Sequence, residues 1–268
     1  MIPSEHRTPT LAPLVLQAEL AGVRTLTLND PGARNALSNP MMAALQQAIE
    51  AAASDIDVRV IVLAAAGPAF CAGHDLKELR ANTDPAFRVA LLARCVRLML
   101  SIVRCPKPVI ARVHGIATAA GCQLVASCDL AIAAAEARFA TPGVNIGLFC
   151  STPMVALSRN LANKHAMEML LTGDLVSAAD AYRMGLVNRV VPAGRLDAEV
   201  QELATKLAAK SRSAIAIGKR AFYEQGELPL EQAYRFAAEA MLLNLQTADC
   251  AEGIGAFVEK RAACWIDP

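Results

Sequence analysis

The chain has 268 residues, of which 54% are hydrophobic and 19% charged, a composition that supports a sizeable core and excludes a disordered protein. That length suits one large domain, or one domain with a small helical appendage. The 26 basic and 25 acidic residues leave a formal net charge of +1, which argues against a nucleic-acid partner or an anionic membrane surface.

Eight cysteines occur without the spacing of a zinc site, and the chain is long for a disulfide scaffold, so we expect free, mostly buried thiols and no metal. Residues 1–13 contain no apolar run of the signal-peptide kind and are expected to form a flexible tail. The most apolar stretch, residues 108–135, is interrupted too often by polar side chains to span a membrane. Together these observations predict a cytoplasmic protein.

The first elements are a hairpin and a helix. Residues 14–17 and 23–28 predict two antiparallel strands joined by an Ala-Gly turn. Asn39 is the expected N-cap of a helix that has Pro40 at its first position and runs to about residue 53.

The middle of the chain alternates strand and helix signals. A β-branched strand is expected at 58–63, followed by a Gly- and Ala-rich loop to residue 75. Asp84-Pro85 predicts the start of a second helix. This helix should end near residue 103. We then expect a strand at 109–113, a loop at 115–119, a helix at 120–127 and a strand at 130–134. Such alternation is typical of β/α units, whose sites lie at the loops after strands.

Helical patterns dominate beyond residue 152. Ser177 and Asp180 form the two ends of a capping box, and Gly185 is a natural helix C-cap. Residues 195–260 predict three or four helices. We therefore divide the chain into a flexible tail at 1–13, a core at 14–192 and a C-terminal helical trimerisation module at 193–268.

Two loops of small residues follow the strands expected at 58–63 and 109–113. Their sequences are F-C-A-G-H-D-L at 70–76 and G-I-A-T-A-A-G-C at 115–122. Small side chains let a ligand approach the main chain closely, and loops that lead into helices present N–H groups without internal partners. Two such donors converging on one oxygen would form an oxyanion hole.

Seven segments carry a wider resemblance: N-A-L-S (35–38), F-C-A-G-H-D-L-K-E-L (70–79), K-P-V-I-A-R-V-H-G-I-A-T-A-A-G-C-Q-L (107–124), C-D-L-A-I-A (128–133), T-G (172–173), A-A-D-A-Y-R-M-G-L-V-N-R-V-V-P (178–192) and E-G-I-G-A-F-V-E-K-R (252–261). With them the chain resembles the crotonase (enoyl-CoA hydratase/isomerase) superfamily. The resemblance implies an α/β fold, a crotonase-like spiral of repeated ββα units with a C-terminal helical module, assembled as a homotrimer or a hexamer. It also implies an acyl-CoA substrate, with coenzyme A as part of the substrate and no separate cofactor.

The resemblance also assigns roles to single residues. The backbone N–H groups of His74 and Ala120 would form the oxyanion hole, with Gly121 beside it. The other substrate-binding positions implied are Ala72, Asp75 and Leu76 near the adenine, Ala36 and Leu37 along the pantetheine, and Phe257 and Lys260 near the nucleotide, reached from a neighbouring subunit.

Two positions depart from the family's hydratases, which add water with two glutamates. Gln123 stands at the first position and Gly143 at the second. A glutamine amide exchanges no proton near neutral pH and glycine has no side chain, so paired-carboxylate catalysis is excluded at these positions. The polar side chains left for the site are His74, Thr118, Gln123, Asn145, Cys150 and Ser151.

Three functions fit this sequence. The first is an acyl-CoA lyase or isomerase of fatty-acid or related acyl-CoA metabolism, with its chemistry resting on the oxyanion hole. The second is a malonyl-type decarboxylase in which His74 would hold the leaving carboxylate, and the third is a non-catalytic acyl-CoA-binding protein. The near-neutral charge disfavours RNA binding. A covalent role for Cys150 is disfavoured because no histidine lies close to it in sequence.

Overall fold

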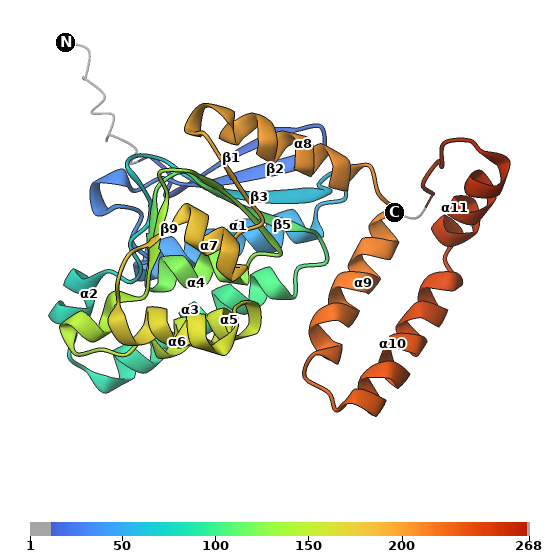
Figure 1. Ribbon diagram of the computed structural model, residues 1–268. Coiled ribbons are helices and arrows are strands. Elements are labelled where there is room, and N and C mark those ends of the chain that lie inside the picture. Colours follow the sequence, from blue (N-terminus) through green and yellow to red (C-terminus); the bar gives the residue numbers. More distant parts are fainter. Residues whose placement is uncertain (1–11, 267–268) are drawn as a thin grey trace, which may run out of the picture.

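The computed structural model describes residues 12–266, so most of the tail expected at 1–13 lies outside the described residues. Within this range the chain forms two sheets flanked by helices, and a group of C-terminal helices stands beside them (Figure 1). None of the helices in residues 12–266 is both long and apolar enough to cross a membrane.

The main sheet has six strands in the order β1-β2-β3-β5-β7-β10. Only β1 runs antiparallel to its neighbour, and the remaining pairs are parallel. The strands are β1 (Val15–Leu20), β2 (Val23–Leu28), β3 (Val60–Ala65), β5 (Val109–Val113), β7 (Leu130–Ala134) and β10 (Arg189–Val191). The hairpin turn is the expected one, with Ala21 and Gly22 both at positive φ, which suits the twist of the flanking strands.

A second, smaller sheet has the order β4-β6-β8-β9. Its strands are β4 (Ala69–Cys71), β6 (Ile116–Thr118), β8 (Arg138–Ala140) and β9 (Val176–Ser177). The chain moves from a main-sheet strand to a short second-sheet strand and then to a helix, and it does so three times in succession from β3 onward. This repetition confirms the expected α/β spiral of ββα units.

Seven helices lie between the strands and near their ends in the core. They are α1 (Asn39–Ser54), α2 (Leu76–Ala81), α3 (Pro85–Val103), α4 (Ala120–Ser127), α5 (Ser151–Asn160), α6 (Asn163–Thr172) and α7 (Ala178–Met184), with short 3₁₀ turns at Pro31–Ala33, Pro142–Ile146 and Ala193–Arg195. Helix α3 begins where Asp84 caps it, as expected, because the Asp84 carboxylate accepts from Ala86 N at 3.0 Å. For α1 the expected N-cap is wrong by one residue: Ser38, not Asn39, caps it by accepting from Met41 N at 3.3 Å.

Both faces of the main sheet are buried, by different helices. Along β3, Ile61 and Leu63 join the large hydrophobic cluster formed with α1, α3 and α4, whereas Val60 and Val62 join a second cluster. Alternate side chains of a strand face opposite sides of the sheet. The second face is covered by α8 (Leu196–Ala208), through residues such as Leu196. Helix α8 therefore packs as part of the core, although the sequence division placed it in the C-terminal module.

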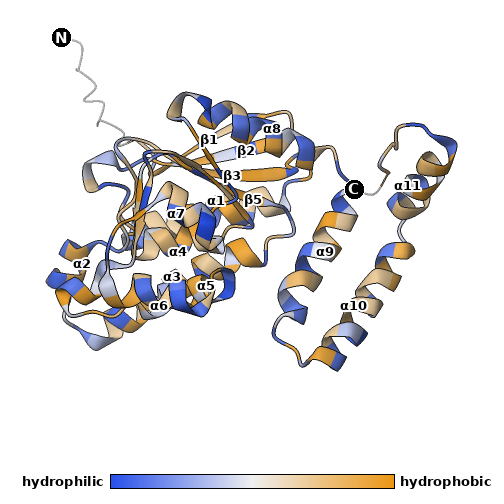
Figure 2. Ribbon diagram, in the orientation of Figure 1, coloured by the Kyte–Doolittle hydropathy of each residue, from blue (hydrophilic) through white to orange (hydrophobic). Residues whose placement is uncertain are grey.

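The helices that stand apart from the sheets are α9 (Arg212–Gln225), α10 (Leu230–Leu245) and α11 (Ala248–Glu259). Helices α9 and α10 lie side by side, and α11 packs on both (Figure 1). Hydrophobic segments continue along α9 and α10 outside the core (Figure 2). Residues 195–260 thus hold four helices, at the upper end of the three or four expected from the sequence.

A buried ion pair fastens α9 to the core. Lys219 Nζ lies 2.7 Å from Asp129 Oδ2 and also donates to the Ile102 carbonyl at 3.1 Å and the Lys107 carbonyl at 3.0 Å. Tyr223 OH donates to Asp129 Oδ1 at 3.0 Å. Asp129 precedes β7, so this cluster fixes the middle and the C-terminal part of α9 relative to the main sheet.

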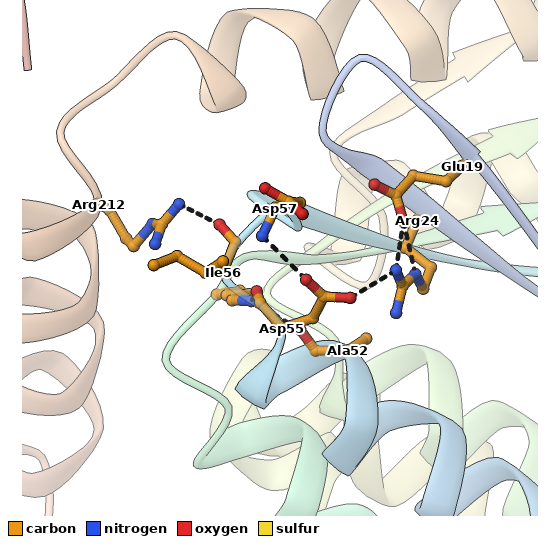
Figure 3. Close-up of polar contacts among 8 residues, drawn as sticks. Glu19, Arg24, Ala52, Asp55, Ile56, Asp57 and Arg212 are labelled. Atoms are coloured by element: carbon orange, nitrogen blue, oxygen red, sulfur yellow. Dashed lines mark hydrogen bonds and ion pairs between the residues drawn. The ribbon is translucent and has the colours of Figure 1, made fainter. Parts of the chain in front are cut away.

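The loop between α1 and β3 is a second attachment point (Figure 3). Asp55 accepts from Arg24 of β2 at 2.8 Å and from the backbone N–H of Asp57 at 2.9 Å. The Arg212 guanidinium at the start of α9 donates to the Ile56 carbonyl of the same loop. One short loop therefore contacts both the N-terminal hairpin and the C-terminal helices.

Candidate active site

The two small-residue loops lie side by side because the strands that lead into them are paired. β4 and β6 are parallel neighbours, with Cys71 opposite Ala117. Thr118 Oγ1 then donates to the Ala72 carbonyl at 3.1 Å. A Cβ built on Gly73 would lie only 3.2 Å from Ala120 N and 3.0 Å from the Thr118 carbonyl oxygen. The loops expected to act together are therefore in direct contact.

Each loop offers one free N–H group at the expected residue. His74 follows Gly73, which has a φ of +91°, and Ala120 is the first residue of α4. Among the described residues, neither the His74 N–H nor the Ala120 N–H donates to another backbone group. The first N–H groups of a helix have no partner within the helix and sit at the positive end of its dipole.

Close packing explains the small residues of the second loop. A Cβ on Gly121 would lie 2.1 Å from the Cys71 carbonyl oxygen, so only glycine fits there. Ala119 has a φ of 51° and a ψ of −121°, a backbone conformation that side chains disfavour. The loop therefore keeps a strained alanine immediately before the Ala120 N–H.

The imidazole of His74 is held in its neutral form. Burial lowers the pKa of His74 below its usual value, and the Leu37 carbonyl lies 3.4 Å from Nδ1. A carbonyl only accepts, so Nδ1 carries the hydrogen and Nε2 carries the lone pair. Nε2 is buried and has no hydrogen-bond partner among the described residues.

Gln123 is one turn along α4 from Ala120, with 5% of its surface exposed. Its Oε1 atom is buried and has no hydrogen-bond partner within residues 12–266. The side chain lines a cavity of about 920 Å³ between α3, α4, α5 and α9, with Leu243 of α10 at one side. A cavity of this size is typical of a small-molecule site.

The backbone itself excludes a side chain at Gly143. A Cβ there would lie 2.0 Å from the Leu148 carbonyl oxygen and 2.9 Å from Cys150 Sγ. The loop closes on itself through a 2.9 Å hydrogen bond from Leu148 N to the Gly143 carbonyl. The position of the second hydratase carboxylate is therefore occupied by main chain.

The other expected side chains of this region offer little acid–base chemistry. Burial raises the pKa of the Cys150 thiol, which keeps it protonated. Ser151 is exposed and its hydroxyl lies 3.4 Å from the Phe149 carbonyl, and Asn145 is exposed. The Asp75 carboxylate is engaged in capping α2, accepting from Lys77 N at 2.8 Å.

The remaining predicted substrate residues lie in two places. Ala36 and Leu37 are buried beside the first loop, where Leu37 N donates to the Gly73 carbonyl at 2.7 Å. Leu76 is exposed at the start of α2. Phe257 is 85% exposed, and both it and Lys260 lie at α11, which packs on α9 and α10 rather than on the loops. One chain therefore does not bring these last two residues to His74 and Ala120.

Asn35 is a supporting residue whose role the sequence analysis missed. Its fully buried side chain donates to the Ala66 carbonyl at 2.8 Å and the Ala69 carbonyl at 2.9 Å, and accepts from Asp30 N at 2.8 Å. These bonds hold the chain that leads into β4. An asparagine three residues after the Pro31-Gly32 pair was the available signal, because asparagine tolerates the positive φ of 53° found there.

Comparisons with known proteins agree on one family. A family model described as enoyl-CoA hydratase/isomerase matches residues 18–268. The enoyl-CoA hydratase domain-containing protein 3, mitochondrial, of Xenopus laevis is 47% identical over 253 residues, covering 94% of this chain and 86% of that protein. Its Homo sapiens counterpart is 46% identical over 247 residues, covering 92% and 82%.

Solved structures show the same similarity. The crystal structure of an enoyl-CoA hydratase from Mycobacterium smegmatis superposes with a TM-score of 0.92 at 56% identity, covering 95% of this chain and 99% of that one. The structure of the human enoyl coenzyme A hydratase domain-containing protein 3 gives a TM-score of 0.91 at 45% identity, covering 94% and 100%.

The comparisons also correct one expectation, that of a cytoplasmic protein. The relatives from Xenopus laevis, Rattus norvegicus and Homo sapiens are all named as mitochondrial proteins. The expectation rested on free thiols and on apolar runs that suit neither a signal peptide nor a membrane span, and buried free thiols fit any reducing compartment. Composition therefore could not distinguish the cytosol from an organelle.

Proposed function

Because the chain belongs to the enoyl-CoA hydratase/isomerase family, we propose that it is an acyl-CoA enzyme that stabilises a thioester enolate between the N–H groups of His74 and Ala120. The observation that carries this proposal is the pair of unpartnered N–H groups on two touching loops. Loss of a proton from the carbon next to a thioester carbonyl, or loss of a carboxylate on that carbon as carbon dioxide, leaves the bonding electrons behind and places negative charge on the carbonyl oxygen. Fixed N–H donors stabilise that charge, and removing one donor typically costs about 10²–10³ in rate.

The proposed chemistry does not include hydration by two glutamates. Gln123 supplies no carboxylate, and the closed loop at Gly143 leaves no room for one. The Asp75 carboxylate of the first loop caps α2, so His74 is the better placed proton acceptor: its imidazole is neutral and its Nε2 has no hydrogen-bond partner within residues 12–266. Proton transfer at the α-carbon, as in an isomerase or a lyase, is the chemistry that these groups support best.

A malonyl-type decarboxylase is less well supported by the same histidine. Holding a leaving carboxylate favours a charged imidazolium, whereas burial lowers the pKa of His74 and favours the neutral form. A non-catalytic acyl-CoA-binding protein is the second candidate. The backbone packing at Gly143 favours this candidate, because it leaves no room for one of the two glutamates that add water in the family's hydratases.

Self-association is part of the proposal. We expect a homotrimer or a dimer of trimers, in which Phe257 and Lys260 reach the nucleotide of a neighbouring subunit's substrate. Large apolar side chains exposed on α10 and α11 support an interface there, namely Leu230, Tyr234, Met241, Leu242, Leu245, Ile254, Phe257 and Val258. Light scattering should give three or six times the 28.3 kDa mass of one chain.

Exchange of the α-protons of butyryl-CoA in deuterated water, followed by NMR, tests enolate formation directly. Proline is tolerated at the first position of a helix and lacks the N–H, so Ala120→Pro removes one donor. We expect its exchange rate to fall about 10²–10³-fold, while the Ala120→Ser control keeps the N–H and most of the rate. Thioester binding without exchange or turnover on any enoyl-, malonyl- or hydroxyacyl-CoA would favour the non-catalytic candidate.

A further inference from the structure

We propose that Glu78 is a positioning residue for His74, and that its carboxylate stabilises the imidazolium that forms once His74 Nε2 has taken a proton from the substrate. The inference rests on the proposed function, in which the neutral imidazole accepts the α-proton of the thioester. It begins with residues 35–39, which run beside the first loop and lead into α1. Glu78 joins the start of α1 to α2.

Four hydrogen bonds connect the segment before α1 to the first loop and to α2. Leu37 N donates to the Gly73 carbonyl at 2.7 Å, and the Leu37 carbonyl lies 3.4 Å from His74 Nδ1. The Glu78 carboxylate accepts from Asn39 N at 3.0 Å through Oε2 and from Asn39 Nδ2 at 2.9 Å through Oε1. The backbone group that holds the imidazole and the one that holds Glu78 are therefore two residues apart on one short segment.

The start of α1 is a favourable place for a carboxylate. Asn39 is the first residue of α1, and the first N–H groups of a helix have no partner within the helix and lie at the positive end of its dipole. Because both oxygens of Glu78 accept hydrogen bonds from Asn39, the negative charge is held at a fixed point four residues after His74. The same bonds fix α2, and with it the loop that carries the imidazole.

Glu78 also acts on the charge of the imidazole. Burial lowers the pKa of His74, and the Leu37 carbonyl and the Glu78 carboxylate both act against that fall. The Asp75 carboxylate is engaged as the N-cap of α2, accepting from Lys77 N at 2.8 Å and from Glu78 N at 3.3 Å, and the Lys77 side chain is exposed. Glu78 is therefore the carboxylate placed to balance a positive charge on His74.

The other segments beside the first loop bring no charge. Residues 35–39 and 115–121 contain no charged side chain. The thiols of Cys71 and Cys122 stay neutral, because burial raises the pKa of each to about 12. The effect of Glu78 on the imidazole is thus not cancelled by a cation on these segments.

Proton transfer explains why this charge matters. When Nε2 takes the α-proton, the electrons of the broken C–H bond stay on the substrate as the enolate, and the imidazole becomes positive. Burial disfavours a positive imidazolium, whereas a nearby carboxylate favours it. The backbone donors at His74 and Ala120 would stabilise the enolate oxygen, and Glu78 would stabilise the opposite charge.

Exchange of the α-protons of butyryl-CoA in deuterated water, measured on the full-length chain across about pH 5–8, tests the proposal. Glu78→Gln keeps the size of the side chain and one acceptor oxygen but removes the charge. Its maximal exchange rate should fall about 3- to 10-fold, while calorimetric titration should show an unchanged Kd for butyryl-CoA. The acidic limb of the rate profile should move to lower pH, because the His74 pKa falls when the carboxylate is lost. NMR titration of the His74 ring should show the same shift.

Two further variants make the test specific. Glu168→Gln removes an exposed carboxylate from α6 and should leave both the rate and the acidic limb unchanged. Asn39→Ala removes one of the two bonds that fix the Glu78 carboxylate but keeps its charge. It should shift the rate and the limb in the same direction as Glu78→Gln, by a smaller amount, and it serves alone if Glu78→Gln does not fold.

The outcomes separate the two proposals. A natural rate and an unchanged acidic limb in Glu78→Gln overturn the role of Glu78 and leave the enolate proposal standing. A lower rate with a weaker Kd and an unchanged limb also overturns it, because Glu78 would then only maintain the shape of the loops. Absence of exchange in the natural protein at every pH overturns this inference together with the proposed function.

Discussion

Replacing Lys219 with methionine should loosen the attachment of α9 to the core. The Lys219 and Asp129 side chains are 9% and 16% exposed, and the ammonium group makes three hydrogen bonds in this buried cluster. Methionine fills a similar volume but leaves the Asp129 carboxylate with only Tyr223 OH and Val109 N as partners. The variant therefore keeps a buried charge without its counter-ion.

The expected size of this effect is large for a single substitution. Removing one partner of a buried ion pair typically costs about 3–5 kcal/mol. For chains of this size each kcal/mol lowers the melting temperature by about 2–4 °C, which gives a total drop of roughly 6–20 °C. Since α9 also forms one wall of the cavity beside Gln123, acyl-CoA affinity should fall as well.

The effect should also depend on pH in a definite direction. Burial raises the pKa of the Asp129 carboxyl and Lys219 opposes that rise, so the pKa should increase further in the variant. A carboxyl whose folded pKa exceeds its unfolded value costs stability as the pH rises through the folded pKa. The gap in stability between the natural protein and Lys219→Met should therefore narrow as the pH falls from neutral towards 5.

Scanning calorimetry at neutral and mildly acidic pH measures both the drop in melting temperature and its dependence on pH. Lys206→Met on the exposed side of α8 serves as the control for loss of a lysine, and Asp129→Asn added to Lys219→Met should recover part of the loss. The reasoning is refuted if Lys219→Met melts within about 2 °C of Lys206→Met, or if its deficit is independent of pH.

Three further predictions concern the loops. Ala119→Gly should relieve backbone strain of about 1–3 kcal/mol. The glycine also makes the unfolded chain more flexible, which lowers the free energy of unfolding by about 0.4–1 kcal/mol. The net effect should raise the melting temperature by a few degrees. Gly143→Ala, whose Cβ would lie 2.0 Å from a carbonyl oxygen, should cost about 1–3 kcal/mol in urea unfolding, while Gly194→Ala, with nothing within 4 Å, should be near neutral. Because burial lowers the pKa of His74, the free energy of unfolding should decline as the pH falls below about 6.5. His74→Gln should make this decline shallower when urea unfolding is measured at several pH values.

Short sequence patterns predicted the helices and strands whose ends are set by neighbouring residues. Helix α4 spans residues 120–127 and β5 spans 109–113, as expected, and α3 begins after Asp84. The strands β4, β6 and β8 were missed because each has only three residues, too few for a pattern of alternating side chains. Their existence depends on pairing with each other across the sheet.

The candidate site also has parts that short sequence patterns predicted and parts that they did not. The two loops and their contact followed from small residues after strands, and six of the eight cysteines are buried as expected. The clamp made by Asn35 and the cavity beside Gln123 depend on packing between distant segments. Lys219 and Tyr223, for example, meet Asp129 from about ninety residues further along the chain. No local pattern encodes such contacts.

The closed loop at Gly143 has a consequence for how this site could change during evolution. A single nucleotide change converts a glutamine codon at position 123 to a glutamate codon, but a glutamate side chain at residue 143 needs the Leu148 carbonyl to move away. Intermediate sequences would carry a clash before they gained a second carboxylate. A two-glutamate hydratase could therefore arise from this site only if the backbone of residues 143–148 also changed, whereas the two backbone donors could be kept throughout.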